Sequence, residues 1–164
     1  MLFIFYIFFI LYILLTTYYF LFIIMKNIIY TDGGSRGNSG PSAIGIYFET
    51  LDKKYSEYLG IATNNDAEYK AMVFALKKIK SLIGSDVAKK TDIEIRSDSQ
   101  LVVNQLSGKF KLKEESLFKY FIEIWNLKQE YKSVSFSYIP REKNKIADML
   151  VNQELDSHSR KGMF

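Results

Sequence analysis

The chain has 164 residues, with no Cys, one His, 22 Lys and Arg residues, and 18 Asp and Glu residues. Without thiols it can form no disulfide, catalytic Cys or zinc-thiolate site, and a single His cannot build a His-rich metal site. Any metal ion bound by this protein must therefore be held by oxygen atoms.

The first 24 residues differ sharply from the rest, because they contain 22 apolar residues, two Thr and no charge. A secretory signal is disfavoured, since the segment lacks a basic start and a small-residue cleavage site. A membrane anchor fits the length, and Lys26 would keep the following domain in the cytoplasm, although almost no linker would remain. We favour a third interpretation, in which Met25 is the true start and residues 1–24 are upstream sequence of low complexity.

The chain after residue 25 begins with a strand pattern. Asn27–Thr31 is a β-branched and aromatic run, and Gly33–Pro41 has the composition of a turn. Ser42–Thr50 and Lys54–Thr63 alternate as two further strands, and the break at 51–53 predicts a hairpin. These three strands are expected to form an antiparallel meander.

Helical periodicity then alternates with two more strands. The predicted helices are Asp66–Ile83, Ser99–Leu106, Glu114–Tyr131 and Lys143–Leu155, and the predicted strands are Asp92–Ser97 and Ser133–Ile139. The order βββαβααβα predicts one mixed α/β domain over residues 25–157, followed by a polar tail over residues 158–164.

Four carboxylates occupy positions where a charged side chain is not expected unless it has a structural or functional role. Asp32 is expected to end the first strand, Glu68 to lie in the first turn of a helix along its buried stripe, Asp98 to follow a strand, and Asp148 to face apolar neighbours on the last helix. Each could be a helix cap or a favourable charge near a helix start. Gathered at one sheet edge, however, the four would raise one another's pKa values unless Mg²⁺ or Mn²⁺ neutralised them.

These acids lie in four segments that together resemble a known family. The segments resemble the four motifs of type 1 ribonuclease H, and they are Tyr30-Thr31-Asp32-Gly33-Gly34, Thr63-Asn64-Asn65-Asp66-Ala67-Glu68-Tyr69, Ser97-Asp98-Ser99-Gln100-Leu101-Val102 and Asn144-Lys145-Ile146-Ala147-Asp148. The resemblance covers residues 27–156. It implies a ribonuclease H-like fold, with a five-stranded mixed sheet of three antiparallel and then two parallel strands, flanked by helices.

The resemblance also implies an activity. A monomeric endoribonuclease of this family would hydrolyse the RNA strand of an RNA/DNA hybrid and leave 5′-phosphate and 3′-hydroxyl ends. Asp32, Glu68, Asp98 and Asp148 would hold two Mg²⁺ ions, with Mn²⁺ as a possible substitute, so that no protein nucleophile is needed.

Substrate contacts are implied by position as well. Asn64, Asn65 and Gln100 match residues that contact the hybrid in the family, and Gly33 and Asn38 match a loop near the RNA strand. The segment 107–113 is too short for the separate basic helix that some members use to grip substrate. The grip would rest instead on three lysines, Lys109, Lys111 and Lys113.

A second departure from the family is Tyr138, which stands where the loop before the last acid often has a His. Arg141 is the nearest cation, and it could hold a phosphate through paired hydrogen bonds. The alternative is that Arg141 pairs with Glu142 or caps the loop. Of the other unusual residues, Trp125 is expected in the core and His158 in solvent.

Net charge fits a polyanionic substrate. The chain has a net charge of +4. If metal ions balance the charge of the four acids, the 22 Lys and Arg residues and the remaining 14 carboxylates give a net charge of +8. Two other functions stay open, a catalytically idle hybrid-binding module and a membrane-tethered scaffold of the same fold. A proofreading-type exonuclease is disfavoured, because its first strand would carry Asp-x-Glu where this chain has Asp32-Gly33-Gly34.

Overall fold

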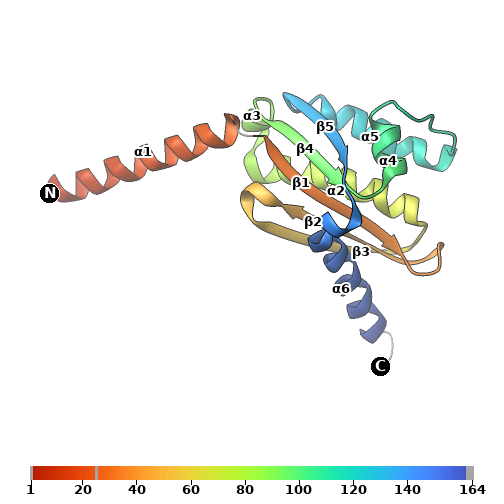
Figure 1. Ribbon diagram of the computed structural model, residues 1–164. Coiled ribbons are helices and arrows are strands. Elements are labelled where there is room, and N and C mark those ends of the chain that lie inside the picture. The colour runs from red at the N-terminus through yellow and green to blue at the C-terminus, as the bar shows by residue number, and fades with distance from the viewer. Residues whose placement is uncertain (1, 25, 162–164) are drawn as a thin grey trace.

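The computed structural model describes residues 2–24 and 26–161, and its centre is one five-stranded sheet (Figure 1). The strands are β1 (Asn27–Ser35), β2 (Gly40–Phe48), β3 (Lys53–Ala62), β4 (Asp92–Ser97) and β5 (Ser133–Tyr138). Their spatial order is β3-β2-β1-β4-β5. The pairs β1–β2 and β2–β3 are antiparallel, and the pairs β1–β4 and β4–β5 are parallel. The predicted mixed sheet is confirmed.

Helices cover both faces of this sheet. They are α2 (Asn64–Ile83), α3 (Ser85–Ala88), α4 (Gln100–Leu106), α5 (Phe118–Lys128) and α6 (Lys145–Lys161), with short 3-10 helices at Glu49–Leu51, Glu115–Leu117 and Arg141–Lys143. The main core lies between the sheet and α2, α4 and α5. A smaller core, formed by Ala43, Val151 and Leu155, lies between the sheet and α6.

The sheet's two faces follow from strand alternation. In β2, Ile44, Ile46 and Phe48 belong to the main core, whereas Ala43 belongs to the core under α6. The same alternation in β1 places Ile29 in the main core and leaves Asp32 on the half-buried side. A carboxylate is thus held on a central strand, on the face that α6 covers.

The end of β1 was predicted wrongly. Asp32 does not end the strand, because β1 continues to Ser35 and pairs with β2 through Gly33 and Gly34. The glycines at this point serve a close approach rather than a turn. A Cβ atom on Gly33 would lie 2.3 Å from the carbonyl carbon of Ala67, so only glycine lets α2 begin directly over the strand.

Gly45 serves the same purpose on the other face. A Cβ atom there would lie 2.3 Å from the carbonyl oxygen of Ala147 in α6. We expect Gly45→Ala to reduce the free energy of unfolding by about 1–3 kcal/mol, because the helix must move away from the sheet. Urea unfolding would measure this, with Gln153→Ala, an exposed position on α6, as the control. Equal stabilities of the two variants would show that α6 does not need this close contact.

The start of α2 is fixed by its own sequence. Thr63 caps the helix, since its hydroxyl accepts a hydrogen bond from the Asp66 backbone and the Asp66 side chain accepts one from the Thr63 backbone. Glu68 consequently lies just beyond the first turn rather than within it. It still shares the buried stripe of Met72, Ala75 and Ile79, as predicted.

Three further expectations differ from the structure. Trp125 is 57% exposed, because α5 buries Tyr120 and Ile124 and turns Trp125 outward. The last helix runs to Lys161 rather than ending at Leu155. His158 therefore lies on a helix, where its ring stacks on Tyr58 with centroids 4.0 Å apart.

The N-terminal segment forms a separate helix, α1 (Leu2–Ile24), which extends away from the sheet in Figure 1. Its residues 4–18 are exposed. The part of the chain that the structure describes contains no helix that is both long and apolar enough to span a membrane.

Candidate active site

The four predicted acids line one cleft of about 320 Å³ at the edge where β1, β4, α2 and α6 meet. Asp32 comes from the middle of β1, Glu68 from α2, Asp98 from the residue after β4, and Asp148 from the first turn of α6. Gly33, Asn64 and Arg141 line the same cleft. Seven of the predicted site residues are therefore brought together.

Asp32 is a half-buried carboxylate that lines this cleft. Its pKa is raised to about 7, mainly by burial and in addition by the nearby carboxylates of Asp98 and Asp148, against opposing effects of the Gly33 backbone and Arg141. Removing a carboxylate from water and surrounding it with like charges both disfavour the ionised form. Asp32 is thus only partly ionised near neutral pH, and a cation that compensated its charge would favour the ionised form.

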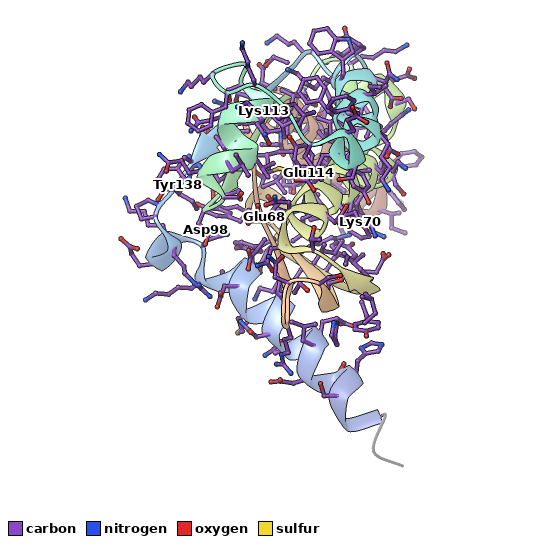
Figure 2. All side chains as sticks on the ribbon, turned by 90° about the vertical axis from the view of Figure 1, so that its right-hand side faces the viewer. Glu68, Lys70, Asp98, Lys113, Glu114 and Tyr138 are labelled. Carbon is purple, nitrogen blue, oxygen red and sulfur yellow. The ribbon has the colours of Figure 1, made fainter. Side chains whose placement is uncertain are left out.

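Glu68 reaches the cleft from the opposite face of the sheet. Its pKa is raised to about 7, mainly by burial and in addition by the charges of Asp32 and Asp98, while the Ser99 hydroxyl opposes the shift by donating a hydrogen bond. Figure 2 shows Glu68 and Asp98 on neighbouring elements near the centre of the molecule. The charge of Asp98 thus helps to raise the pKa values of both Asp32 and Glu68.

Asp98 does not cap the following helix. Ser99 does so, because its side chain accepts a hydrogen bond from the Val102 backbone at the start of α4. Asp98 Oδ1 instead accepts a hydrogen bond of 2.6 Å from the Asn144 side chain. The helix-cap interpretation of Asp98 was therefore wrong, which leaves its carboxylate available for another role.

Asp148 is paired with Arg141. The guanidinium donates a hydrogen bond of 2.6 Å to Asp148 Oδ1, and Asn152 donates one of 3.2 Å to Asp148 Oδ2. The Arg141 side chain is 76% exposed, so its far side faces solvent at the mouth of the cleft. The predicted alternative, a pair with Glu142, is not the contact that Arg141 makes. Tyr138, at the end of β5, is 50% exposed.

The donor set of this cleft fits a hard divalent cation, because all four acidic side chains offer oxygen and two of them carry raised pKa values. Within residues 2–24 and 26–161, however, no three acidic or His side chains lie close enough together to hold one ion as they stand. Asp148 is held by Arg141 in this arrangement.

Two of the predicted substrate residues also fix the loop beside the cleft. Asn38 has a positive φ of 38°, and its side chain accepts a hydrogen bond of 3.0 Å from the Asn64 backbone. The Asn64 side chain in turn accepts one of 2.7 Å from the Ser35 backbone. These contacts join the β1–β2 connection to the start of α2.

The remaining predicted substrate residues lie outside the cleft. Gln100 is exposed, and the Asn65 amide donates a hydrogen bond of 3.5 Å to Glu114. Lys109, Lys111 and Lys113 line a separate hollow of about 540 Å³, together with Phe110, which is 49% exposed. Lys113 and Glu114 are labelled in Figure 2 on the loop above Glu68.

Sequence reasoning did not assign roles to Ser99 and Asn144. Both lie inside the motifs quoted above, yet their roles depend on partners 31 and 46 residues away along the chain. A small hydroxyl or amide residue next to a strand end is also typical of a cap. Only the folded arrangement distinguishes a cap from a side chain that holds an acid.

Comparisons with known proteins show which family this sequence and fold resemble. A family described as "Reverse transcriptase-like" matches residues 31–154. A bifunctional protein of Mycobacterium tuberculosis is 34% identical over 138 residues, covering 81% of this chain and 36% of the relative. Ribonuclease HI of Halobacterium salinarum is 37% identical over 131 residues, covering 77% and 63%. The chain therefore spans less than two thirds of the length of these relatives.

Solved structures match over nearly their whole length. LC11-RNase H1 in complex with an RNA/DNA hybrid is 41% identical, with a TM-score of 0.76, and the match covers 81% of this chain and 99% of that chain. The RNase H1 from Halobacterium salinarum is 36% identical, with a TM-score of 0.72 and the same coverage.

Proposed function

Because the chain belongs to the type 1 ribonuclease H family, we propose that it is an endoribonuclease that hydrolyses the RNA strand of RNA/DNA hybrids and leaves 5′-phosphate and 3′-hydroxyl ends. The observation that carries the proposal is the single cleft lined by Asp32, Glu68, Asp98 and Asp148. One ribonuclease H1 of the same fold has been solved in complex with an RNA/DNA hybrid.

The four acids, Asp32, Glu68, Asp98 and Asp148, are proposed to hold two Mg²⁺ ions, or Mn²⁺ in their place. When bound, the ions supply an activated water and neutralise charge on the departing 3′ oxygen. The residues of the cleft favour this use. Raised pKa values at Asp32 and Glu68 mean that cation binding releases protons and stabilises both carboxylates in their ionised form.

Arg141 is proposed to hold the scissile or departing phosphate. Its guanidinium carries several donors, and one of them is occupied by Asp148. The exposed part of the side chain leaves other donors for a phosphate oxygen at the mouth of the cleft. Arg141 cannot act as a general base, so its role is binding and charge compensation.

The substrate surface is proposed to extend from the cleft in two directions. Gly33, Asn38, Asn64, Asn65 and Gln100 would contact the sugar edges of the hybrid, where amides can donate to and accept from 2′-hydroxyl groups. Lys109, Lys111 and Lys113 line their own hollow and would bind the phosphate backbone. We further propose that the enzyme acts as a monomer.

We place the domain in the cytoplasm. Lys26 is the first charge after the apolar segment, and under the positive-inside rule it would remain on the cytoplasmic side if that segment entered a membrane.

The proposal predicts a defined substrate choice for the purified full-length protein. With Mg²⁺ present, we expect cleavage of the RNA strand in a labelled RNA/DNA hybrid, no cleavage of duplex DNA of the same sequence, and a steep loss of activity with added salt. Chelation with EDTA should abolish cleavage. Equal cutting of duplex DNA would contradict the proposal, and binding of the hybrid without cleavage would indicate the idle hybrid-binding module instead.

A further inference from the structure

Asn144 is a buried amide whose side chain is bonded to one of the four acids, Asp98. It lies between the 3-10 helix Arg141–Lys143 and α6, and only 1% of its surface is exposed. Its side-chain nitrogen donates a hydrogen bond of 3.0 Å to the Thr31 carbonyl and one of 2.6 Å to Asp98 Oδ1. Both side-chain N–H groups thus serve acceptors on other elements.

The two acceptors fix which way the amide points. A carbonyl and a carboxylate can only accept, so the nitrogen must face them and the oxygen must face away. Asn144 Oδ1 is buried and has no hydrogen-bond donor among the described residues. A buried acceptor without a donor destabilises a fold. The benefit of Asn at this position therefore comes from its two N–H groups.

The contacts of Asn144 include two of the four acids, Asp98 and Asp148, and the residue before a third. Thr31 directly precedes Asp32 on β1, and Asp98 is bound through its carboxylate. The backbone carbonyl of Asn144 also accepts a hydrogen bond of 3.1 Å from the Asp148 backbone. One residue consequently joins β1, the end of β4 and the start of α6.

We propose that Asn144 is a positioning residue that holds the Asp98 carboxylate against β1 in the orientation that hydrolysis requires. This inference rests on the proposed function for its catalytic consequence and on the contacts above for its structural part. Partners that orient a metal-binding carboxylate typically contribute about 10-fold to 100-fold to metal affinity or activity.

Burial separates this role from substrate binding. A side chain that is 1% exposed cannot contact an RNA/DNA hybrid. Loss of the Asn144 side chain should therefore lower kcat and leave KM for the hybrid unchanged. A residue that contacts substrate would raise KM, and a residue that only supports the fold would change neither value below the melting temperature.

The test compares Asn144→Ala with Thr91→Val in the full-length protein. Thr91 lies just before β4, at the opposite end from Asp98, and is buried with its hydroxyl donating a hydrogen bond of 2.8 Å to the Val87 carbonyl. Thr91→Val therefore removes a buried side-chain hydrogen bond far from the acids. We expect kcat to fall about 10-fold to 100-fold in Asn144→Ala at saturating Mg²⁺, and to change less than about twofold in Thr91→Val.

A second measurement needs no metal and no activity. Melting temperatures without Mg²⁺ should be non-additive when Asn144→Ala is combined with Asp98→Ala, and additive when it is combined with Glu68→Ala, which Asn144 does not contact. Additivity in both pairs would overturn the inference, as would kcat in Asn144→Ala equal to that in Thr91→Val. If the wild-type protein fails to cleave the hybrid, the proposed function is wrong, and the metal-free measurement still decides whether Asn144 holds Asp98.

Discussion

Asp98→Asn is expected to reduce hydrolysis of an RNA/DNA hybrid at least about 1,000-fold while the protein remains folded. A metal-holding carboxylate contributes several kcal/mol to transition-state stabilisation, and each 1.4 kcal/mol is a factor of ten in rate. Asparagine keeps the shape of the side chain and an oxygen that can accept the hydrogen bond from Asn144. The substitution therefore removes the charge with little change in packing.

Single-turnover cleavage of a labelled hybrid, with circular dichroism and thermal unfolding of each variant, would measure this effect. Glu57→Gln is the matched control, because Glu57 is an exposed carboxylate on β3 outside the cleft. Hybrid binding by Asp98→Asn should be retained, since the change reduces negative charge facing a polyanion. Near-wild-type cleavage by Asp98→Asn would rule out the proposed role of the four acids.

Most of the fold could be predicted from periodicity, because each element buries one stripe or one face. β4 was predicted with the bounds that the structure shows, since its Ile93 and Ile95 alternate with polar residues and are both fully buried. The end of β1 could not be predicted in this way. Gly33-Gly34 is typical of a turn, and the reason for glycine there is the approach of α2, which depends on tertiary structure.

Helix α5 shows a second limit of periodicity. The sequence predicted Trp125 in the core, whereas the structure buries Tyr120 and Ile124, packs Phe121 against the core and leaves Trp125 exposed. Periodicity gives the spacing of an apolar stripe, but a helix rich in aromatic and aliphatic residues has more than one candidate face. Which face is buried depends on the packing partner, and here that partner is α2.

The four acidic residues of the site could be predicted from the sequence. The side chains that hydrogen-bond to those acids could not. Four carboxylates expected near strand ends and helix starts were predicted to share one edge of the sheet, and they line one cleft there, although Asp32 lies within β1 rather than at its end. The pairing of Arg141 with Asp148 and of Asn144 with Asp98 could not be predicted, because each partner lies on another element. For Arg141 and Asn144, the partner could be identified only from the three-dimensional structure.

The second large effect concerns stability without metal, where Asp32→Asn is expected to stabilise the protein at pH 8. The pKa of Asp32 is raised from 3.8 to about 7 in the folded protein, so the folded state binds this proton more tightly than the unfolded chain does. Stability due to this group therefore falls as the pH rises from about 4 to about 7, and the loss is complete above that range. Asparagine carries no charge and avoids the loss.

Urea unfolding of wild type and Asp32→Asn in EDTA, at pH 5 and pH 8, would test this linkage. We expect the variant to be more stable by about 1–3 kcal/mol at pH 8 and by much less at pH 5, since each unit of pKa shift corresponds to about 1.4 kcal/mol. Subtracting the unfolding free energy of wild type from that of the variant cancels the pH-dependent contributions of other carboxylates, such as Glu94, whose pKa is lowered. Added Mg²⁺ should stabilise wild type more than the variant, because only the wild-type cleft gains a full set of carboxylates for the ion. A stability difference that is the same at both pH values would mean that Asp32 is ionised at no cost in the folded protein, and that the cleft does not need a cation to hold its charges together.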